Sequence, residues 1–258
     1  MDIRSFNRDA WDKQVDSGNN PWTQPVSPEV IAASRRGEIS VLLTEQKSVP
    51  DEWIPPLKGL DVLCLASGGG QQGPIFAAAG ANVTVLDNSP KQLERDRFVA
   101  HREGLQLITI EGDMRDLSIF ADETFDFIFH PVSNVFCPDV LPVWKEAYRV
   151  LRYGGTLVAG MMNPLYYLFD FDVLEEKGEL NVRYSIPYSD AESLPPDKLE
   201  EFKKNGTPLE FSHTLTDLIG GQCEAGFHII GFYEDKHAEA LLSKYHPTYI
   251  ATRALKAG

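Results

Sequence analysis

The sequence has few cysteines and no long apolar run, and each absence narrows what the chain can be. Its three cysteines, Cys64, Cys137 and Cys223, stand far apart without a CxxC pair, so neither a disulfide framework nor a metal site is expected. No apolar run reaches the length of a membrane span, and the first residues, MDIRSFNRDAWDKQ, lack the apolar core of a signal peptide. These absences predict a cytoplasmic protein without a membrane partner.

Clustered positive charge is also missing. The chain has 24 Lys and Arg against 38 Asp and Glu, a formal net charge of −14, and no dense basic tract. Binding to nucleic acid normally requires a cationic surface that displaces counterions, so a nucleic-acid partner is not expected. With 43% apolar and 24% charged residues among 258, the composition is that of an ordinary globular protein.

The first 58 residues differ from the rest of the chain. They are polar and interrupted by Pro and Gly, with helical patches at 6–17 and 28–37, and VPDEWIPPLKG at 49–59 is typical of a linker because its prolines break regular structure. We therefore predict an N-terminal helical lid segment over 1–58 and a main domain over 59–258. Trp11 and Trp22 could lie in such a lid, or flank a turn between two surface helices.

From residue 60 onward, short apolar runs alternate with helical segments. The runs DVLCLA, NVTVLD, LQLITIEG, FDFIFH and TLVAGM have the length and composition of strands. Strands that are apolar on both faces and separated by helices are typical of a parallel sheet covered on both sides. Two last runs, FHIIGFYED and PTYIATRAL, have no helix between them and predict an antiparallel hairpin at one edge. The expected fold class is α/β, a doubly wound, mostly parallel seven-stranded sheet with a cap insertion at about 163–213, where LNVRYSI is one possible strand.

A glycine loop follows the first predicted strand, and an acid ends the second. Gly68, Gly69 and Gly70 lie where open α/β sheets bind ligands, and without Cβ atoms they let the backbone approach a ligand closely. Asp87 stands 19 positions after Gly68, and a carboxylate there can accept hydrogen bonds from both hydroxyls of a ribose. The pattern predicts a cofactor that contains ribose. The alternative is that the glycines serve the turn alone and Asp87 caps the helix that starts near Pro90.

The same loop also satisfies the dinucleotide pattern GxGxxG, as Gly68, Gly70 and Gly73. An oxidoreductase dependent on NAD(P) or flavin is therefore a rival hypothesis at this point.

Four segments in order resemble the class I S-adenosylmethionine-dependent methyltransferases, in particular their small-molecule branch. They are VLCLASGGG, VTVLDNS, EGDMRDLS…ETFDFIF and EAYRVLRYGGTLV, and the resemblance extends over about 58–255. A helix that ends in RVLxxGG before the fifth strand is frequent in this family and not expected of a dehydrogenase. The resemblance implies a Rossmann-like fold, S-adenosylmethionine as cofactor with S-adenosylhomocysteine as its product, and methyl transfer to an unidentified small-molecule acceptor by in-line displacement.

The resemblance also implies a role for each matching position. Asp87 would hold the ribose hydroxyls, Asp113 would accept from the adenine amino group, and His130 would lie near the sulfonium and the acceptor. The positions implied to contact the cofactor are Ser67, Gly68, Gly69, Gly70, Asp87, Asn88, Ser89, Asp113, Met114, His130 and Asn134. The family usually has an acid where Cys64 stands and a glycine where Ala66 stands. These two departures leave a non-catalytic relative that binds S-adenosylmethionine as a further alternative.

Two histidines are candidate catalytic bases, which methyl transfer requires only if the acceptor is protonated. His130 ends the fourth predicted strand, and His213 lies where the insertion returns to the sheet. His130 could instead shape the cofactor pocket, and His213 could flank a helix cap. The aromatic residues of the insertion could line an acceptor pocket or form the core of the cap: Tyr166, Tyr167, Phe169, Tyr184 and Tyr188.

Overall fold

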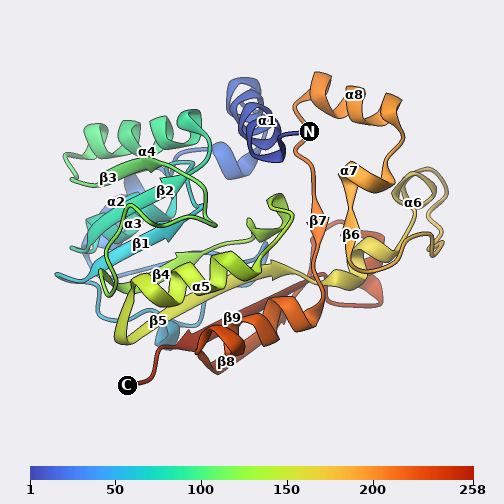
Figure 1. Ribbon diagram of the computed structural model, residues 1–258. Helices are drawn as coiled ribbons and strands as arrows, with labels where there is room; N and C mark the ends of the chain where they lie inside the picture. The colour runs from blue at the N-terminus through green and yellow to red at the C-terminus, as the bar shows by residue number, and fades with distance from the viewer.

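The computed structural model describes residues 1–258, except for the side chain of Glu175. A seven-stranded sheet with the strand order β3-β2-β1-β4-β5-β9-β8 crosses the molecule (Figure 1). Strands β1 to β5 are parallel, and β9 is antiparallel to both β5 and β8. The predicted doubly wound sheet with a C-terminal antiparallel hairpin is confirmed. The strands are β1 (Asp61–Leu65), β2 (Asn82–Asp87), β3 (Ile108–Glu111), β4 (Phe125–His130), β5 (Leu151–Met162), β8 (His228–Asp235) and β9 (Tyr249–Leu255).

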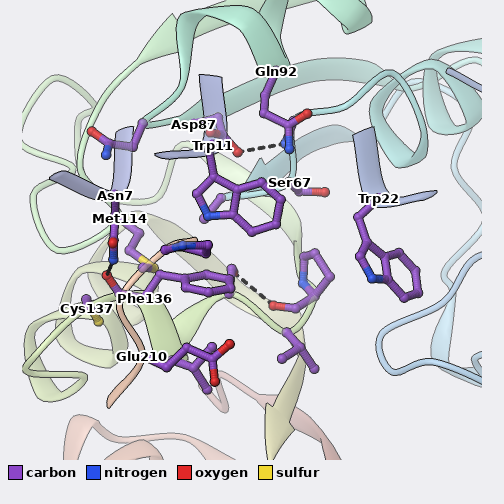
Figure 2. Close-up of a pocket in the computed structure, with 18 of the residues that line it drawn as sticks. Asn7, Trp11, Trp22, Ser67, Asp87, Gln92, Met114, Phe136, Cys137 and Glu210 are labelled. Atoms are coloured by element: carbon purple, nitrogen blue, oxygen red, sulfur yellow. Dashed lines mark hydrogen bonds between the residues drawn. The ribbon is translucent and has the colours of Figure 1, made fainter. Parts of the chain in front are cut away.

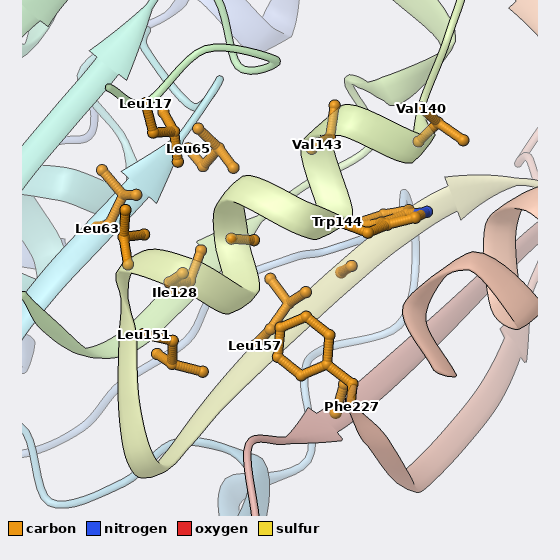
Figure 3. Packing of buried hydrophobic residues seen from close by; sticks show 14 of the residues in the cluster. Leu63, Leu65, Leu117, Ile128, Val140, Val143, Trp144, Leu151, Leu157 and Phe227 are labelled. Carbon is orange, nitrogen blue, oxygen red and sulfur yellow. The ribbon is translucent and has the colours of Figure 1, made fainter. Parts of the chain in front are cut away.

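Helices cover both faces of the sheet, and β1 supplies side chains to both apolar layers. Successive side chains of a strand point to opposite faces. Leu63 and Leu65 therefore pack with Trp144 of α5 (Figure 3), and Val62 and Cys64 pack in the other cluster with Phe76 of α3. The helices that follow the strands are α3 (Gln72–Ala78), α4 (Pro90–Glu103), α5 (Leu141–Val150) and α9 (Gly221–Ala225), which continues a π-helical turn, η5 (Thr216–Gly220).

Local sequence sets the ends of α4, the helix beside the glycine loop. The Ser89 hydroxyl accepts a hydrogen bond from Gln92 N at 3.1 Å, and Pro90 occupies the first turn, where its missing N–H costs nothing. Gly104 ends the helix with a φ of 66°, a conformation that favours glycine. These signals fix where α4 starts relative to the end of β2.

The N-terminal 58 residues contain α1 (Ile3–Ser17), α2 (Pro28–Arg35) and two short 3₁₀ turns, η1 (Pro21–Thr23) and η2 (Asp51–Trp53). The expected linker is packed rather than free. Trp53 and Leu57 are buried in the cluster with Val62, and the Trp53 ring lies 5.2 Å from that of Tyr233 on β8. The prolines do interrupt regular structure, but the apolar side chains between them anchor the segment to the sheet.

The cap insertion is built of short elements around an aromatic core. Tyr188 lies 5.5 Å from Tyr167 and 4.9 Å from Tyr184, ring centre to ring centre. The predicted strand LNVRYSI is wrong, because Val182 makes only an isolated bridge to Phe169 and is 66% exposed. The cap contains η4 (Pro164–Leu168), α6 (Phe171–Lys177), β6 (Tyr188–Ser189), α7 (Asp190–Ser193), α8 (Pro196–Asn205) and β7 (Phe211–Ser212), with β6 and β7 antiparallel.

Two more 3₁₀ turns complete the described structure, η3 (Asn134–Phe136) after β4 and η6 (Leu241–Lys244) between β8 and β9. Among the described residues, no helix combines the length and the apolarity needed to cross a membrane.

Candidate functional site

A cavity of about 400 Å³ lies at the carboxyl ends of β1, β2 and β4, where open α/β sheets bind their ligands. Its walls are α1 and the turn after it, residues 42–45, the start of the glycine loop, the ends of β2 and β3, the loop 131–138, Met162 and Tyr249 on β5 and β9, and Pro208 and Glu210 of the cap. Figure 2 shows Asp87 and Glu210 on opposite sides of the cavity, with Trp11 and Phe136 between them. The cavity therefore joins the sheet, the N-terminal segment and the cap.

Not all predicted cofactor residues line this cavity. Ser67, Gly68, Asp87, Asn88, Asp113 and Met114 do. Five others lie behind its walls: Gly69, Gly70, Ser89, His130 and Asn134. Of these, Ser89 is the buried cap of α4, and its hydroxyl donates to Asp12 at 2.6 Å.

The glycine loop packs against protein on the side away from the cavity. Gly69 and Gly70 have φ values of +119° and +74°. A Cβ on Gly70 would lie 2.7 Å from the carbonyl oxygen of Arg95 in α4, and one on Gly69 would lie 2.6 Å from that of Trp22. Gly68 N donates to Asp87 at 2.9 Å. Glycine is therefore required for the fit of α4 and of the N-terminal segment against this loop.

Asp87 ends β2 with its carboxylate held by backbone. One oxygen accepts from Gly68 N and the other from Ser89 N, both at 2.9 Å. Burial raises the pKa of Asp87, and these hydrogen bonds oppose that rise. Each carboxylate oxygen has a second lone pair, so this side chain can accept further hydrogen bonds from a ligand in the cavity.

A second buried carboxylate, Asp96, was missed by sequence reasoning. It lies behind the loop on α4, where one carboxylate oxygen accepts a hydrogen bond from Gly69 N at 3.1 Å. Burial raises its pKa to about 8. Burial and the nearby Asp96 also raise the pKa of the Cys64 thiol. The available signal was the position of Asp96 three residues after Leu93, on the apolar face of α4.

Ala66 occupies a backbone conformation that suits glycine, with a φ of +49°. A left-handed conformation costs a residue with a Cβ about 1–2 kcal/mol, whereas glycine loses about 0.4–1 kcal/mol through its freer unfolded state. We expect Ala66→Gly to raise the melting temperature by about 1–3 °C, measured by calorimetry. Ala32→Gly, in the middle of α2, should lower it. Equal losses in both variants would contradict strain at Ala66.

The asparagine Asn134 connects the two candidate histidines. The fully buried His130 donates from Nδ1 to the carbonyl of Leu65 at 2.9 Å, and its Nε2 lies 3.5 Å from the Asn134 amide. Burial lowers the pKa of His130 to about 4. His213 Nε2 donates to Asn134 O at 3.0 Å, and burial lowers its pKa too. Neither histidine lines the cavity. Both hold the loop after β4 in place.

The wall near β3 carries a carboxylate and two cations. Arg115 donates to Asp113 at 2.7 Å, and these hydrogen bonds outweigh burial and lower the pKa of Asp113. Arg4 Nε donates to Asn88 Oδ1 at 3.0 Å, and the Asn88 amide donates back to Arg4 O at 2.9 Å. Each cation on this wall is therefore engaged by a neighbour.

The opposite wall carries Glu210, which sequence reasoning also missed. Its Oε2 accepts from the Tyr167 hydroxyl at 2.6 Å, and burial raises its pKa to about 7. No pattern in the sequence marks this residue, because only the approach of the cap brings it to the cavity. The aromatic residues of the insertion stand behind it and do not line the cavity.

The helix α1 covers the cavity and is tied to both walls. The Asn7 amide donates to Phe136 O and to Leu209 O, each at 2.9 Å, and Asn7 Oδ1 accepts from Leu209 N at 2.7 Å. Trp11 packs edge-on against Phe136 at 5.1 Å. Trp22 also lines the cavity (Figure 2).

The family model and the relatives in sequence that match this chain are methyltransferases. The sequence model of the family described as Methyltransferase domain matches residues 63–159. The chain is 55% identical over 252 residues to a protein of Bacillus subtilis named "Uncharacterized methyltransferase YbaJ", with 98% of each chain covered. It is 38% identical over 168 residues to the sterol 24-C-methyltransferase erg6 of Aspergillus fumigatus, and that match covers 62% of this chain and 42% of the relative.

Solved structures share the fold at low sequence identity. A putative S-adenosylmethionine-dependent methyltransferase from Listeria monocytogenes superposes with a TM-score of 0.62 at 17% identity, covering 88% of this chain and 100% of the other. A Burkholderia thailandensis 1,6-didemethyltoxoflavin-N1-methyltransferase with bound 1,6-didemethyltoxoflavin and S-adenosylhomocysteine gives 0.58 at 14% identity, covering 98% and 88%.

Proposed function

This chain belongs to the class I S-adenosylmethionine-dependent methyltransferases, and on that premise we propose that its cavity holds the cofactor along one wall and a small-molecule acceptor along the other. The protein is an enzyme whose cofactor is S-adenosylmethionine. The proposal concerns which residues bind the cofactor, what kind of acceptor binds beside it, and which segment closes the cavity.

The cofactor wall fits its ligand through the chemistry of its exposed groups. Asp87 offers unused carboxylate lone pairs at the end of β2 for the ribose hydroxyls, and Gly68 lines the cavity beside it. Asp113 and Met114 would face the adenine. The cofactor supplies a methyl group on a positively charged sulfur, an already activated carbon. The main task of the chain is therefore to position the acceptor and to exclude water.

The acceptor wall consists of the loop after β4, the end of the cap and the segment around Glu45. Val132, Met162 and Tyr249 give it apolar surface, and Glu45 and Glu210 give it carboxylates. A cavity of about 400 Å³ under a helix suits a small ligand rather than a polymer. The names of the sterol and toxoflavin methyltransferases support an acceptor of that size.

The segment 1–26 would act as a lid. It crosses the cavity from the glycine loop to the cap. At the glycine loop, Val26 N donates to Gly70 O at 3.0 Å, and at the cap, the Gln14 amide donates to Gly206 O at 2.7 Å. Substrates would enter when these polar contacts open, and closure would remove water from the reacting atoms. His130 and His213 would then serve as positioning residues for the loop after β4.

The observation that carries this proposal is a single cavity with Asp87 on one wall and Glu210 on the other. Isothermal titration of the full chain with S-adenosylhomocysteine and, separately, with NAD(H) tests it. We expect heat of binding with S-adenosylhomocysteine and none with NAD(H). Binding of NAD(H) alone would overturn the assignment of the cavity to S-adenosylmethionine.

A further inference from the structure

We propose that Glu210 binds the acceptor as a protonated amine and takes its proton before methyl transfer, which makes the acceptor a basic amine. This inference rests on the proposed function, because it assigns the acceptor wall of the same cavity.

The backbone of Glu210 is fixed on both sides by the cap. Glu210 N donates to Asp190 Oδ2 at 2.7 Å, and Glu210 O accepts from Asp190 N at 3.0 Å. The Tyr167 hydroxyl, itself buried, donates to Glu210 Oε2 at 2.6 Å. The carboxylate is thereby held at the cavity wall, as a group that must contact a bound molecule requires.

The charges that line the cavity are unequally distributed. Arg4 and Arg115, the only lysine or arginine residues of the described lining, lie on the cofactor wall beside Asn88 and Asp113. The acceptor wall has Glu45 and Glu210 instead. An anion that reached Glu45 and Glu210 would therefore meet two carboxylates, whereas an ammonium group would be attracted to them.

The residues around Glu210 are uncharged or acidic, and such surroundings favour a carboxyl group that gains and loses a proton near neutral pH. Tyr167 of η4, Tyr188 of β6, Asp190 of α7 and Tyr249 of β9 surround it, and none is cationic. Burial raises the pKa of Glu210 to about 7, Asp190 adds to the rise, and the Tyr167 hydrogen bond opposes it. A carboxyl with such a pKa can accept a proton in the closed cavity and release it when the cavity opens.

The proposed step balances in atoms and charge. The ammonium group R–NH₃⁺ gives one proton to the Glu210 carboxylate and becomes R–NH₂. The nitrogen lone pair then forms the N–C bond to the methyl carbon while the C–S bond breaks, and its electron pair stays on sulfur. The product leaves as R–NH₂⁺–CH₃, and Glu210 returns its proton to water.

Three probes of matched shape test the class of acceptor: 2-phenylethylamine, 4-ethylphenol and 3-phenylpropionate. Each is titrated into the full chain saturated with S-adenosylhomocysteine, followed by NMR line shifts. We expect the amine to bind at least tenfold more tightly than the phenol or the carboxylate. We also expect Glu210→Gln to reduce amine affinity at least tenfold, while Glu234→Gln, on the exposed surface of β8, does not. An equal or reversed preference, or a preference kept in Glu210→Gln, overturns the proposal.

A pH series separates proton transfer from simple attraction. The Glu210 carboxyl carbon, assigned as the ¹³C signal missing from Glu210→Gln, should titrate near pH 7. Tyr167→Phe should move that midpoint upward, because it removes a hydrogen bond that favours the ionised form. A midpoint below pH 5 in the wild type overturns the role of proton acceptor. Heat of S-adenosylhomocysteine binding in every variant shows whether the proposed function itself holds.

Discussion

Replacing Asp87 with alanine should weaken the binding of S-adenosylhomocysteine at least tenfold and leave the sheet folded. The change removes a charged acceptor of the ribose hydroxyls and the partner of Gly68 N and Ser89 N. A hydrogen bond to a charged group contributes about 1.5–3 kcal/mol, and about 1.4 kcal/mol corresponds to a factor of ten. Isothermal titration measures the dissociation constant, and circular dichroism checks the fold.

The control for Asp87 is Asp61→Ala, at the amino end of β1. Asp61 accepts from Arg152 at 2.9 Å, so its loss tests the removal of an aspartate from the same sheet far from the cavity. This variant should bind S-adenosylhomocysteine normally. An unchanged dissociation constant in a folded Asp87→Ala protein would remove Asp87 from the site.

Gly69→Ala should displace the segment that crosses the cavity. The new Cβ would lie 2.6 Å from Trp22 O, and the φ of +119° is strained for any residue with a Cβ. The backbone of 20–26 must therefore move away from the loop. We expect faster amide exchange over 1–26 and about tenfold weaker binding of S-adenosylhomocysteine.

Gly37→Ala is the matched control for strain without a clash. Gly37 has a φ of +87°, and nothing lies within 4 Å of a Cβ built on it. This variant should lose about 1–2 kcal/mol of stability and keep normal exchange over 1–26. If Gly69→Ala behaves in the same way, the contact with Trp22 does not hold the lid.

The parts of the fold that were predictable depend on local sequence. The strands of the sheet carry continuous apolar runs, and Ser89, Pro90 and Gly104 mark the ends of α4 within a few residues. The segment LNVRYSI has comparable β propensity and failed, because a strand also needs a partner. In the structure, β6 pairs with β7 further along the chain, and no residue near Val182 predicts that pairing.

The residues that line the cavity were predictable where they directly follow a strand. They were not predictable where packing between distant parts of the chain brings them to the cavity. The ends of β1 and β2 placed Gly68 and Asp87 at the cavity. His130 does end β4, but its ring turns toward Leu65 O and Trp144, and the direction of a side chain cannot be read from its strand position. Glu210 and Asn7 meet the cavity only through long-range packing.

The contacts of α1 have a consequence for the order in which the molecule assembles. Asn7 bonds to Leu209, 202 positions away, and to Phe136, 129 positions away, and Arg4 bonds to Asn88 across 84 positions. Contacts of such sequence separation form late, because the intervening chain must first be ordered. During synthesis, α1 can therefore meet Asn88 and Phe136 before Leu209 has been made, and its bond to the cap forms only afterwards. A nascent chain that ends before Leu209 would already have the parallel strands and would still lack a closed cavity.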